Sequence, residues 1–210
     1  MIFRSNPLDL LILIPLFIIS ITMHEAAHAY AAYAFGDDTA AKEGRLTLNP
    51  LAHLDPLGAI MVLLVGFGWA KPVPVDPRNL RNPNWQMPAV AAAGPLANLF
   101  LAILSIVLLI LSTHTGQSFF AEPLFLSASL NLLLMLFNLV PLPPLDGAGI
   151  LRGFLPRPWQ FKLDELGAYG PVILIVLVFV PGVKEVFFGT LYGMAKFIFE
   201  FLMGIFAFLG

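Results

Sequence analysis

Four apolar segments in this chain of 210 residues meet or approach the length of about 20 residues that crosses a lipid bilayer as an α-helix. These segments are residues 10–35, 87–112, 124–142 and 187–208. Only 11% of the residues are charged, whereas soluble domains average about 25%. The pattern predicts an all-α polytopic membrane protein with about five to six transmembrane helices. We expect one integral-membrane domain over residues 1–210, with a core at roughly 10–155 and additional helices over 166–210.

Two further apolar segments are too short for a simple span. Residues 170–180 could cross with tilt or in a thinned bilayer. Residues 57–70 number only 14 and include three glycines, so we expect a re-entrant or buried segment there. The alternating pattern of residues 45–48 is typical of a short strand, which predicts a small β or re-entrant element in this part of the chain.

The distribution of basic residues predicts the orientation of the chain in the membrane. If residues 57–70 do not span, eight lysines and arginines share one side and two lie on the other, as counted from the sequence. If they do span, the count is seven against three. The positive-inside bias favours the first arrangement, with five spans, the N-terminus outside and the C-terminus cytoplasmic. A cell-membrane location fits this reading, and without a basic stripe we expect no nucleic-acid partner.

The pentapeptide His24-Glu25-Ala26-Ala27-His28 lies near the end of the first apolar segment. Residues four apart share a face of an α-helix, so the two imidazoles can approach one metal ion. Glu25 lies where it could take a proton from a metal-bound water. The chain has no cysteine, so any metal here must use nitrogen and oxygen ligands. The pattern is that of a zinc hydrolase, although it also occurs by chance in helices.

A catalytic zinc keeps three protein ligands, and Asp146 is our candidate for the third. It follows an apolar helix that three prolines interrupt, and an acidic residue so close to the hydrocarbon suggests a functional site. In the predicted topology it reaches the same cytoplasmic depth as His24 and His28. Asp146 could instead cap the next helix or pair with Arg152. The other two histidines are weaker candidates. We interpret His53 as a turn residue at the membrane interface, with a metal or substrate role as the alternative. We interpret His114 as a solvated loop residue.

Three motifs together resemble the site-2 protease family of intramembrane zinc metalloproteases. They are His24-Glu25-Ala26-Ala27-His28-Ala29, Gly94-Pro95-Leu96-Ala97-Asn98, and Asn138 through Pro141 followed by Pro143 and Leu145-Asp146-Gly147. Their order and spacing match over roughly residues 10–155. The resemblance implies that His24, His28 and Asp146 bind one zinc ion. It also implies that Glu25 activates water and that the enzyme cuts a transmembrane segment of another protein.

The segment over residues 42–83 looks like the compact subgroup of that family. The chain has no room for a PDZ domain between its motifs and no CBS pair after its last helix, which leaves open how substrates are selected.

Several residues are candidates for contact with the substrate. Asn138 is the first candidate to share negative charge in the transition state or to hold the substrate backbone, and Asn98 is the second, unless its amide serves another helix. A helical substrate must be held extended for cleavage, which a strand containing Leu46 and Leu48 could do by strand addition. Contact or gating roles are also predicted for His53, Pro141 and Pro143.

Two other functions fit parts of the pattern. A metal-ion transporter could use the same ligands, but it would need polar residues continuing to both membrane faces. A catalytically inactive membrane scaffold would more naturally lack the base or one of the ligands. The outer half of each predicted helix is nearly free of ionisable residues, and the base and all three candidate ligands are present, so the sequence favours a zinc-dependent intramembrane endopeptidase. The sequence leaves its oligomeric state open.

Overall fold

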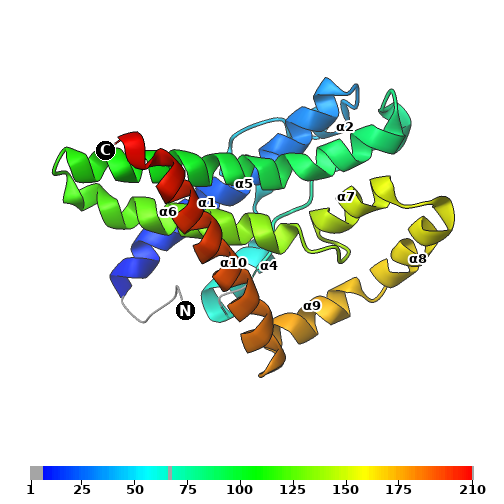
Figure 1. Cartoon of the computed structure of the whole chain (residues 1–210). Coiled ribbons are helices and arrows are strands. Elements are labelled where there is room, and N and C mark those ends of the chain that lie inside the picture. The colour runs from blue at the N-terminus through cyan, green and yellow to red at the C-terminus, as the bar shows by residue number, and fades with distance from the viewer. Residues whose placement is uncertain (1–6, 66–67, 210) are drawn as a thin grey trace.

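The computed structural model describes residues 7–65 and 68–209 and is built from helices (Figure 1). Four of its helices are long and apolar enough to cross a membrane, as the four apolar segments predict. They are α1 (Pro7–Ala34), α5 (Pro83–His114), α6 (Ala121–Asn138) and α10 (Val183–Phe206). The shorter helix α9 (Gly170–Phe179) has ten residues. At 1.5 Å per residue it reaches about 15 Å, roughly half of the hydrocarbon thickness.

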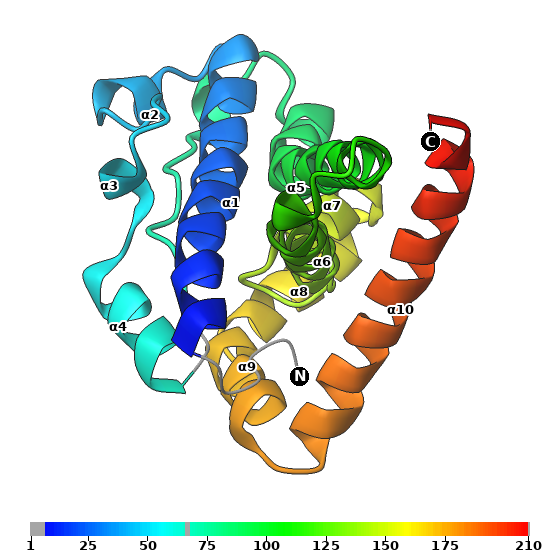
Figure 2. The ribbon, with the colours of Figure 1, turned by 90° about the vertical axis from the view of Figure 1, so that its left-hand side faces the viewer.

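Helix α5 is the centre of the bundle, with α6 antiparallel beside it. Helix α1 runs in the opposite sense to α5 and crosses it at an angle, so that a view along α5 and α6 shows α1 from the side (Figure 2). On the third side, α10 crosses α5 and α6 obliquely (Figure 1). Small residues let these helices approach closely, as is typical inside membranes. The main apolar cluster joins α5, α6 and α10 and consists of Ala102, Leu132, Met135, Leu136, Leu191 and Ala195.

The far end of α10 lies beside the turn between α5 and α6. Ile106, Ile110 and Ala128 pack there against Phe199 and Phe206 of α10. Because α1 runs antiparallel to α5, its first turn lies at this same end of the bundle (Figure 1). The described helices thus place the start of α1 and the end of α10 at one end of the bundle, whereas five spans would place the chain ends on opposite sides of a membrane. The number of spans and the orientation stay predictions.

The segment between α1 and α5 is a series of short helices. They are α2 (Thr39–Lys42), α3 (Pro50–His53), α4 (Pro56–Val65) and the 3₁₀ turn η1 (Pro77–Asn79). The chain leaves at Leu54 and returns at Ala70, where the two residues form an antiparallel bridge. The Lys71 amide also donates to the His53 carbonyl at 2.8 Å. The segment thus begins and ends at one place, as a re-entrant segment does, although residues 66–67 lie outside the described part.

Residues 45–48 do not form the predicted strand. Their backbone is bent and irregular, and the Leu54–Ala70 bridge is the β pairing found in the described residues. Asn49 accepts a hydrogen bond from the Leu51 amide as the N-cap of α3, so the chain turns into a helix directly after Leu48. This local capping competes with strand formation.

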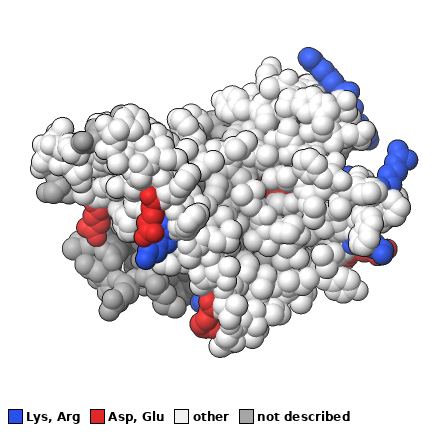
Figure 3. Space-filling model, viewed as in Figure 1, with Lys and Arg blue, Asp and Glu red and all other residues white. Residues whose placement is uncertain are grey.

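The chain after α6 forms two short helices at the end of the bundle opposite the α5–α6 turn. These are α7 (Asp146–Phe154) and α8 (Arg157–Gly167), and the remaining 3₁₀ turns are η2 (Ser118–Phe120) and η3 (Ala207–Leu209). Arg152 of α7 forms a two-bond ion pair with Asp164 of α8, at 3.1 Å for each bond. Basic side chains cluster at this end, whereas most of the remaining face is uncharged (Figure 3).

Asp37 holds the end of α1 to the segment that leads into α5. Its buried carboxylate accepts hydrogen bonds from the backbone and hydroxyl of Thr39, from the Asp76 amide at 2.8 Å and from the Asn79 side chain at 2.9 Å. Burial by itself raises the pKa of Asp37, but these hydrogen bonds favour the carboxylate and hold the pKa below its usual range.

Asp37→Asn is expected to lower the free energy of unfolding by about 1–2 kcal/mol at neutral pH, because the amide cannot accept all four bonds. The folded pKa of Asp37 lies below the unfolded value of about 3.9, so its stabilisation is present at neutral pH and is lost as the pH falls below about 4. Thermal unfolding in detergent at pH 7 and at pH 3.5 measures this. The neighbour Asp38, whose half-exposed side chain pairs with Lys42 on the surface, is the matched control, and equal effects of Asp37→Asn and Asp38→Asn would contradict the assignment.

Candidate metal centre

Two histidines of α1 and the first residue of α7 converge on one point. His24 and His28 are one helical turn apart, and their Nε2 atoms are 3.1 Å from each other. Asp146 approaches with one carboxylate oxygen 3.0 Å from Nε2 of His24 and the other 3.4 Å from Nε2 of His28. Asp146 lies 122 positions after His24 in the sequence, and the fold brings it together with both histidines.

The turn between α6 and α7 carries Asp146 to the histidines. Pro141, Pro143 and Pro144 lack the amide hydrogens that a continued helix would need, so α6 ends at Asn138. Helix α7 then begins at Asp146 itself, with Leu145 as its N-cap. A Cβ atom at Gly147 would lie 2.2 Å from the Leu139 carbonyl oxygen, so only glycine lets the turn close this tightly.

Hydrogen bonds fix the tautomer of both histidines. Nδ1 of His28 lies 2.7 Å from the Val90 carbonyl oxygen, which can only accept, so this nitrogen carries the proton. Nδ1 of His24 lies 2.6 Å from Oδ1 of Asn98 and is a donor for the same reason. In neutral imidazoles, the two Nε2 atoms are then both unprotonated.

The centre therefore brings two nitrogen lone pairs and a carboxylate together in a buried place. These groups repel one another unless a cation lies among them, because unpaired polar groups are costly away from water. Tetrahedral ligands about 2.0–2.1 Å from a zinc ion lie about 3.3–3.5 Å apart. The observed distances of 3.0 to 3.4 Å come close to this spacing. The donor set and its geometry thus fit a metal ion.

Gly94 of α5 leaves the space that such an ion needs. A Cβ atom at this position would lie 2.4 Å from Nε2 of His28 and 2.5 Å from Nε2 of His24. Both distances are close to a metal–nitrogen bond of about 2.0–2.1 Å. Any side chain larger than hydrogen at position 94 would therefore compete with the ion for the same point.

Asn98 is a positioning residue for His24. Its side chain is fully buried, and its amide nitrogen donates to the Ser20 carbonyl and to Oδ1 of Asn131. The Asn131 amide donates in turn to the Ser127 carbonyl at 2.9 Å, so the orientation of both amides is set. Such partners of a ligating histidine fix its ring and raise its basicity. Asn131 was not among the residues predicted from the sequence, although a lone amide in an apolar segment indicates such a residue.

Glu25 lies next to the cluster and is partly exposed. It directly follows His24 on α1, so it lies beside two of the three side chains of the cluster. Arg45, which is buried, and Asp146 add to the charges that act on Glu25. Glu25 is therefore the candidate base of the centre.

An open cavity of about 260 Å³ lies against Asp146. It is bounded by the turn before α7, by α7 itself and by one side of α8, and its lining includes Pro143, Pro144, Ala148, Arg152 and Asp164. The cavity gives the carboxylate side of the centre access to the end of the bundle where the basic residues cluster.

The remaining candidate residues lie in other surroundings. The Asn138 amide donates to the Leu134 carbonyl of its own helix, and His53 is fully buried with Nε2 2.8 Å from the Thr47 carbonyl. Neither belongs to the metal-ligand cluster found in the described residues. Arg152 pairs with Asp164, so the alternative pairing of Asp146 with Arg152 is wrong. Leu48 and Pro141 are exposed, Leu46 and Pro143 are partly buried, and His114 is exposed at the end of α5.

Comparison with known proteins agrees with this site. The model of peptidase family M50 matches residues 109–178, which include Asp146. A Bacillus subtilis protein named "Putative zinc metalloprotease YwhC" is 46% identical over 187 residues, which cover 85% of each chain. "Putative zinc metalloprotease Rip2" of Mycolicibacterium smegmatis is 32% identical over 184 residues, covering 83% of this chain and 69% of the relative. The chain belongs to peptidase family M50. No solved structure matches it significantly.

This M50 protein should lose its metal when Gly94 is replaced by alanine. The new methyl group would occupy the point between the two Nε2 atoms, and we expect bound metal to fall from about one ion per chain to near zero. Elemental analysis of the purified protein measures this. Gly204→Ala is the control, because a Cβ atom there meets open space. A Gly94→Ala variant with full metal content would show that the ion lies elsewhere.

Replacement of Asn98 by alanine should weaken metal binding without abolishing it. His24 keeps its place on α1 but loses the acceptor for its Nδ1 hydrogen, and changes of this kind cost about 10–100-fold in metal affinity. Competition with a chelator of known affinity gives the number. Asn138→Ala removes an amide that bonds only its own helix in this structure, so it should bind metal like the wild type. Equal affinities of the Asn98 and Asn138 variants would contradict the positioning role.

Proposed function

We propose that this chain is a zinc-dependent intramembrane endopeptidase that hydrolyses a peptide bond within or near a transmembrane segment of a membrane-protein substrate. The observation that carries the proposal is the convergence of His24, His28 and Asp146 beside Glu25, on helices long enough to cross a bilayer. Two imidazole nitrogens, a carboxylate and an open position form the donor set of catalytic zinc sites. The names of its M50 relatives support the same metal and reaction class.

Each residue of the centre has a distinct role in this proposal. His24, His28 and Asp146 hold the ion, and Asn98 and the Val90 carbonyl keep the imidazoles in the tautomer that binds metal. When bound, zinc supplies Lewis acidity toward a peptide carbonyl and makes a water molecule more acidic. Glu25 accepts a proton from that water and delivers it to the nitrogen of the leaving amine. The cleavage consumes one water and yields a new carboxylate and a new amine.

The cavity beside Asp146 is our candidate for the place where the substrate backbone reaches the centre. Its lining includes Pro143, whose neighbourhood lacks regular helix and so exposes backbone groups to a bound peptide. Contacts from Asn138, Leu46, Leu48, Pro141 and His53 remain predictions. Asn138 would have to release the Leu134 carbonyl before its amide could share charge in the transition state.

We further propose that the end of the bundle with α2, α7 and α8 faces the cytoplasm of a cell membrane. Basic side chains cluster at this end, as the positive-inside bias requires (Figure 3). The first turn of α1 and the end of α10 then face the outside together. Accessibility labelling of cysteines introduced into this cysteine-free chain would measure both ends directly.

Glu25→Gln should keep zinc and lose cleavage. The amide has nearly the same shape but cannot accept the proton, and loss of a general base typically costs about 10²–10⁴-fold in rate. His24→Ala and Asp146→Ala should lose both zinc and cleavage, because each removes a ligand. Cleavage of candidate transmembrane peptides by protein in lipid vesicles, with zinc measured on the same samples, tests all three variants. Wild-type cleavage by Glu25→Gln would refute the mechanism.

Two further variants separate this function from its rivals. Asn138→Ala should bind zinc normally and slow cleavage if Asn138 contacts the transition state, so unchanged cleavage would remove that role. A transporter would move zinc across sealed vesicles and leave the peptides intact. A scaffold would do neither, even with zinc bound.

A further inference from the structure

Two opposite charges lie on the outer surface of α10, near the middle of that helix. Lys196 and Glu200 are one turn apart, with 3.8 Å between the ammonium and a carboxylate oxygen, and about two thirds of each side chain is exposed. Charged residues in membrane-spanning helices almost always face a bundle interior or a water-filled cavity. In one copy of this chain, most of both side chains lies outside the bundle instead. Figure 3 shows that charged side chains are sparse on this face of the molecule.

Lys196 lies at the border of the packed face of α10, beside α6, and Glu200 lies further round toward the outer side. Leu191 and Ala195 pack against α5 and α6, and the next turns of the same face reach the second apolar cluster. At about 100° per residue, Lys196 and Glu200 lie roughly 100–140° around the helix from the middle of that packed face. Gly189 and Gly193 fall on the same outer side as the charges. A Cβ atom at either glycine would meet nothing within 4 Å, so this surface is open.

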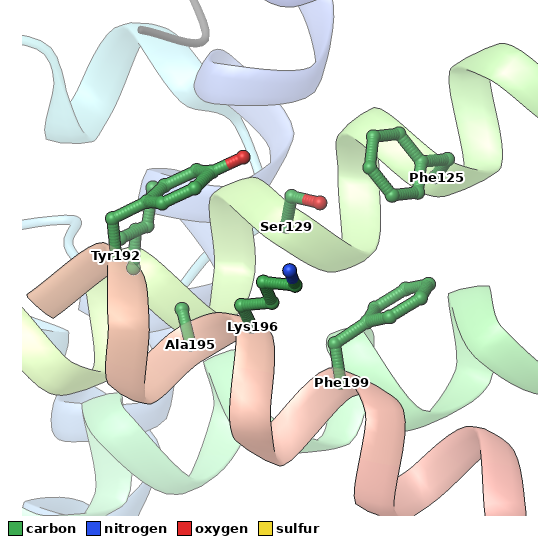
Figure 4. Close-up of a pocket in the computed structure, with 7 residues that line it drawn as sticks. Phe125, Ser129, Tyr192, Ala195, Lys196 and Phe199 are labelled. Atoms are coloured by element: carbon green, nitrogen blue, oxygen red, sulfur yellow. The ribbon is translucent and has the colours of Figure 1, made fainter.

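The crevice beside Lys196 is too small for another molecule to enter it and pair with the two charges. It lies between α6 and α10, with a volume of about 50 Å³. Figure 4 shows the Lys196 ammonium directed toward Ser129, with Phe125 and Phe199 on one side and Tyr192 on the other. A crevice of this size suits a few waters better than a lipid headgroup or a side chain from a further helix. The outer face of α10 is therefore the place to look for a partner.

We propose that α10 is the interface between two copies of this chain in the membrane. The outer face carries one base and one acid a turn apart, so it is complementary to itself about a two-fold axis. In a parallel pair of helices, Lys196 of each copy can reach Glu200 of the other, which replaces exposure to lipid by a network of four charges. Gly189 and Gly193 have the spacing that lets two membrane helices approach closely. The proposal needs α10 to span the membrane and is independent of the proteolytic activity.

The absence of cysteine from the chain makes a direct test possible. Gly193→Cys places one thiol at the proposed contact, and Met194→Cys places one at nearly the same depth but about 100° around the helix, on an exposed position. The full-length protein is purified, reconstituted in vesicles of neutral phosphatidylcholine and oxidised with copper phenanthroline. The Gly193 variant should form disulfide-linked dimers about tenfold faster than the Met194 variant. Equal rates, or no dimer from the Gly193 variant, would overturn the proposal.

Charge reversal tests the self-complementary pair. In K196E or in E200K alone, all four side chains at the contact carry the same charge and repel one another. We therefore expect the dissociation constant of the dimer to rise about tenfold or more. The double variant K196E/E200K restores opposite charges and should restore the dimer. Förster transfer between labelled copies diluted into lipid measures this. A double variant that stays monomeric would contradict the pairing, and a site for an anionic lipid would show no such rescue.

A third variant guards against misfolding of the reversed chains. Gly193→Leu keeps both charges and fills the contact, so it should weaken the dimer while metal content and zinc-dependent cleavage stay at wild-type levels. A Gly193→Leu protein that dimerises normally would also overturn the proposal. Loss of cleavage in Glu25→Gln, by contrast, should leave the dimer unchanged, so failure of the proposed function and failure of the interface are distinguishable.

Discussion

The mutual repulsion of two imidazole lone pairs and a carboxylate is the interaction on which the arrangement of this protein depends. His24, His28 and Asp146 approach within 3.0 to 3.4 Å, and the protons on both Nδ1 atoms leave no hydrogen to relieve the contact in neutral rings. A bound cation turns this repulsion into attraction. It then joins α1 to α7, which both pack against α5.

The same centre explains the sequence of α5. Gly94 provides the space for the ion, Val90 provides an acceptor for one imidazole and Asn98 an acceptor for the other. These residues are four apart and so lie on one face of α5, which forms one side of the centre. A membrane helix can offer polar groups in this way only if each has a partner, and the chain from Asn98 through Asn131 to the Ser127 carbonyl provides them.

The sequence alone was sufficient for the four long helices and for the ligand set. Helix length follows from the run of apolar residues, and two histidines four apart share a face whatever the tertiary structure. The prolines before Asp146 also mark a helix end without further information. The structure was needed for features that depend on contacts between distant segments. The sequence left two roles open for Asn98, a substrate contact or an amide that serves another helix. The packing of α5 on α1 shows that it bonds the Ser20 carbonyl and Nδ1 of His24.

The chain after α8 depends on contacts that a count of basic residues cannot register. The direction of α10 is set by its packing against Ile106, Ile110 and Ala128, and the ten residues of α9 reach only about half of the hydrocarbon thickness. The strand expected at residues 45–48 failed because the Asn49 cap decides the local backbone and alternation of polar and apolar residues does not. In both places a short segment follows its neighbours, because a few residues gain too little from their own pattern to hold a conformation against the packing around them.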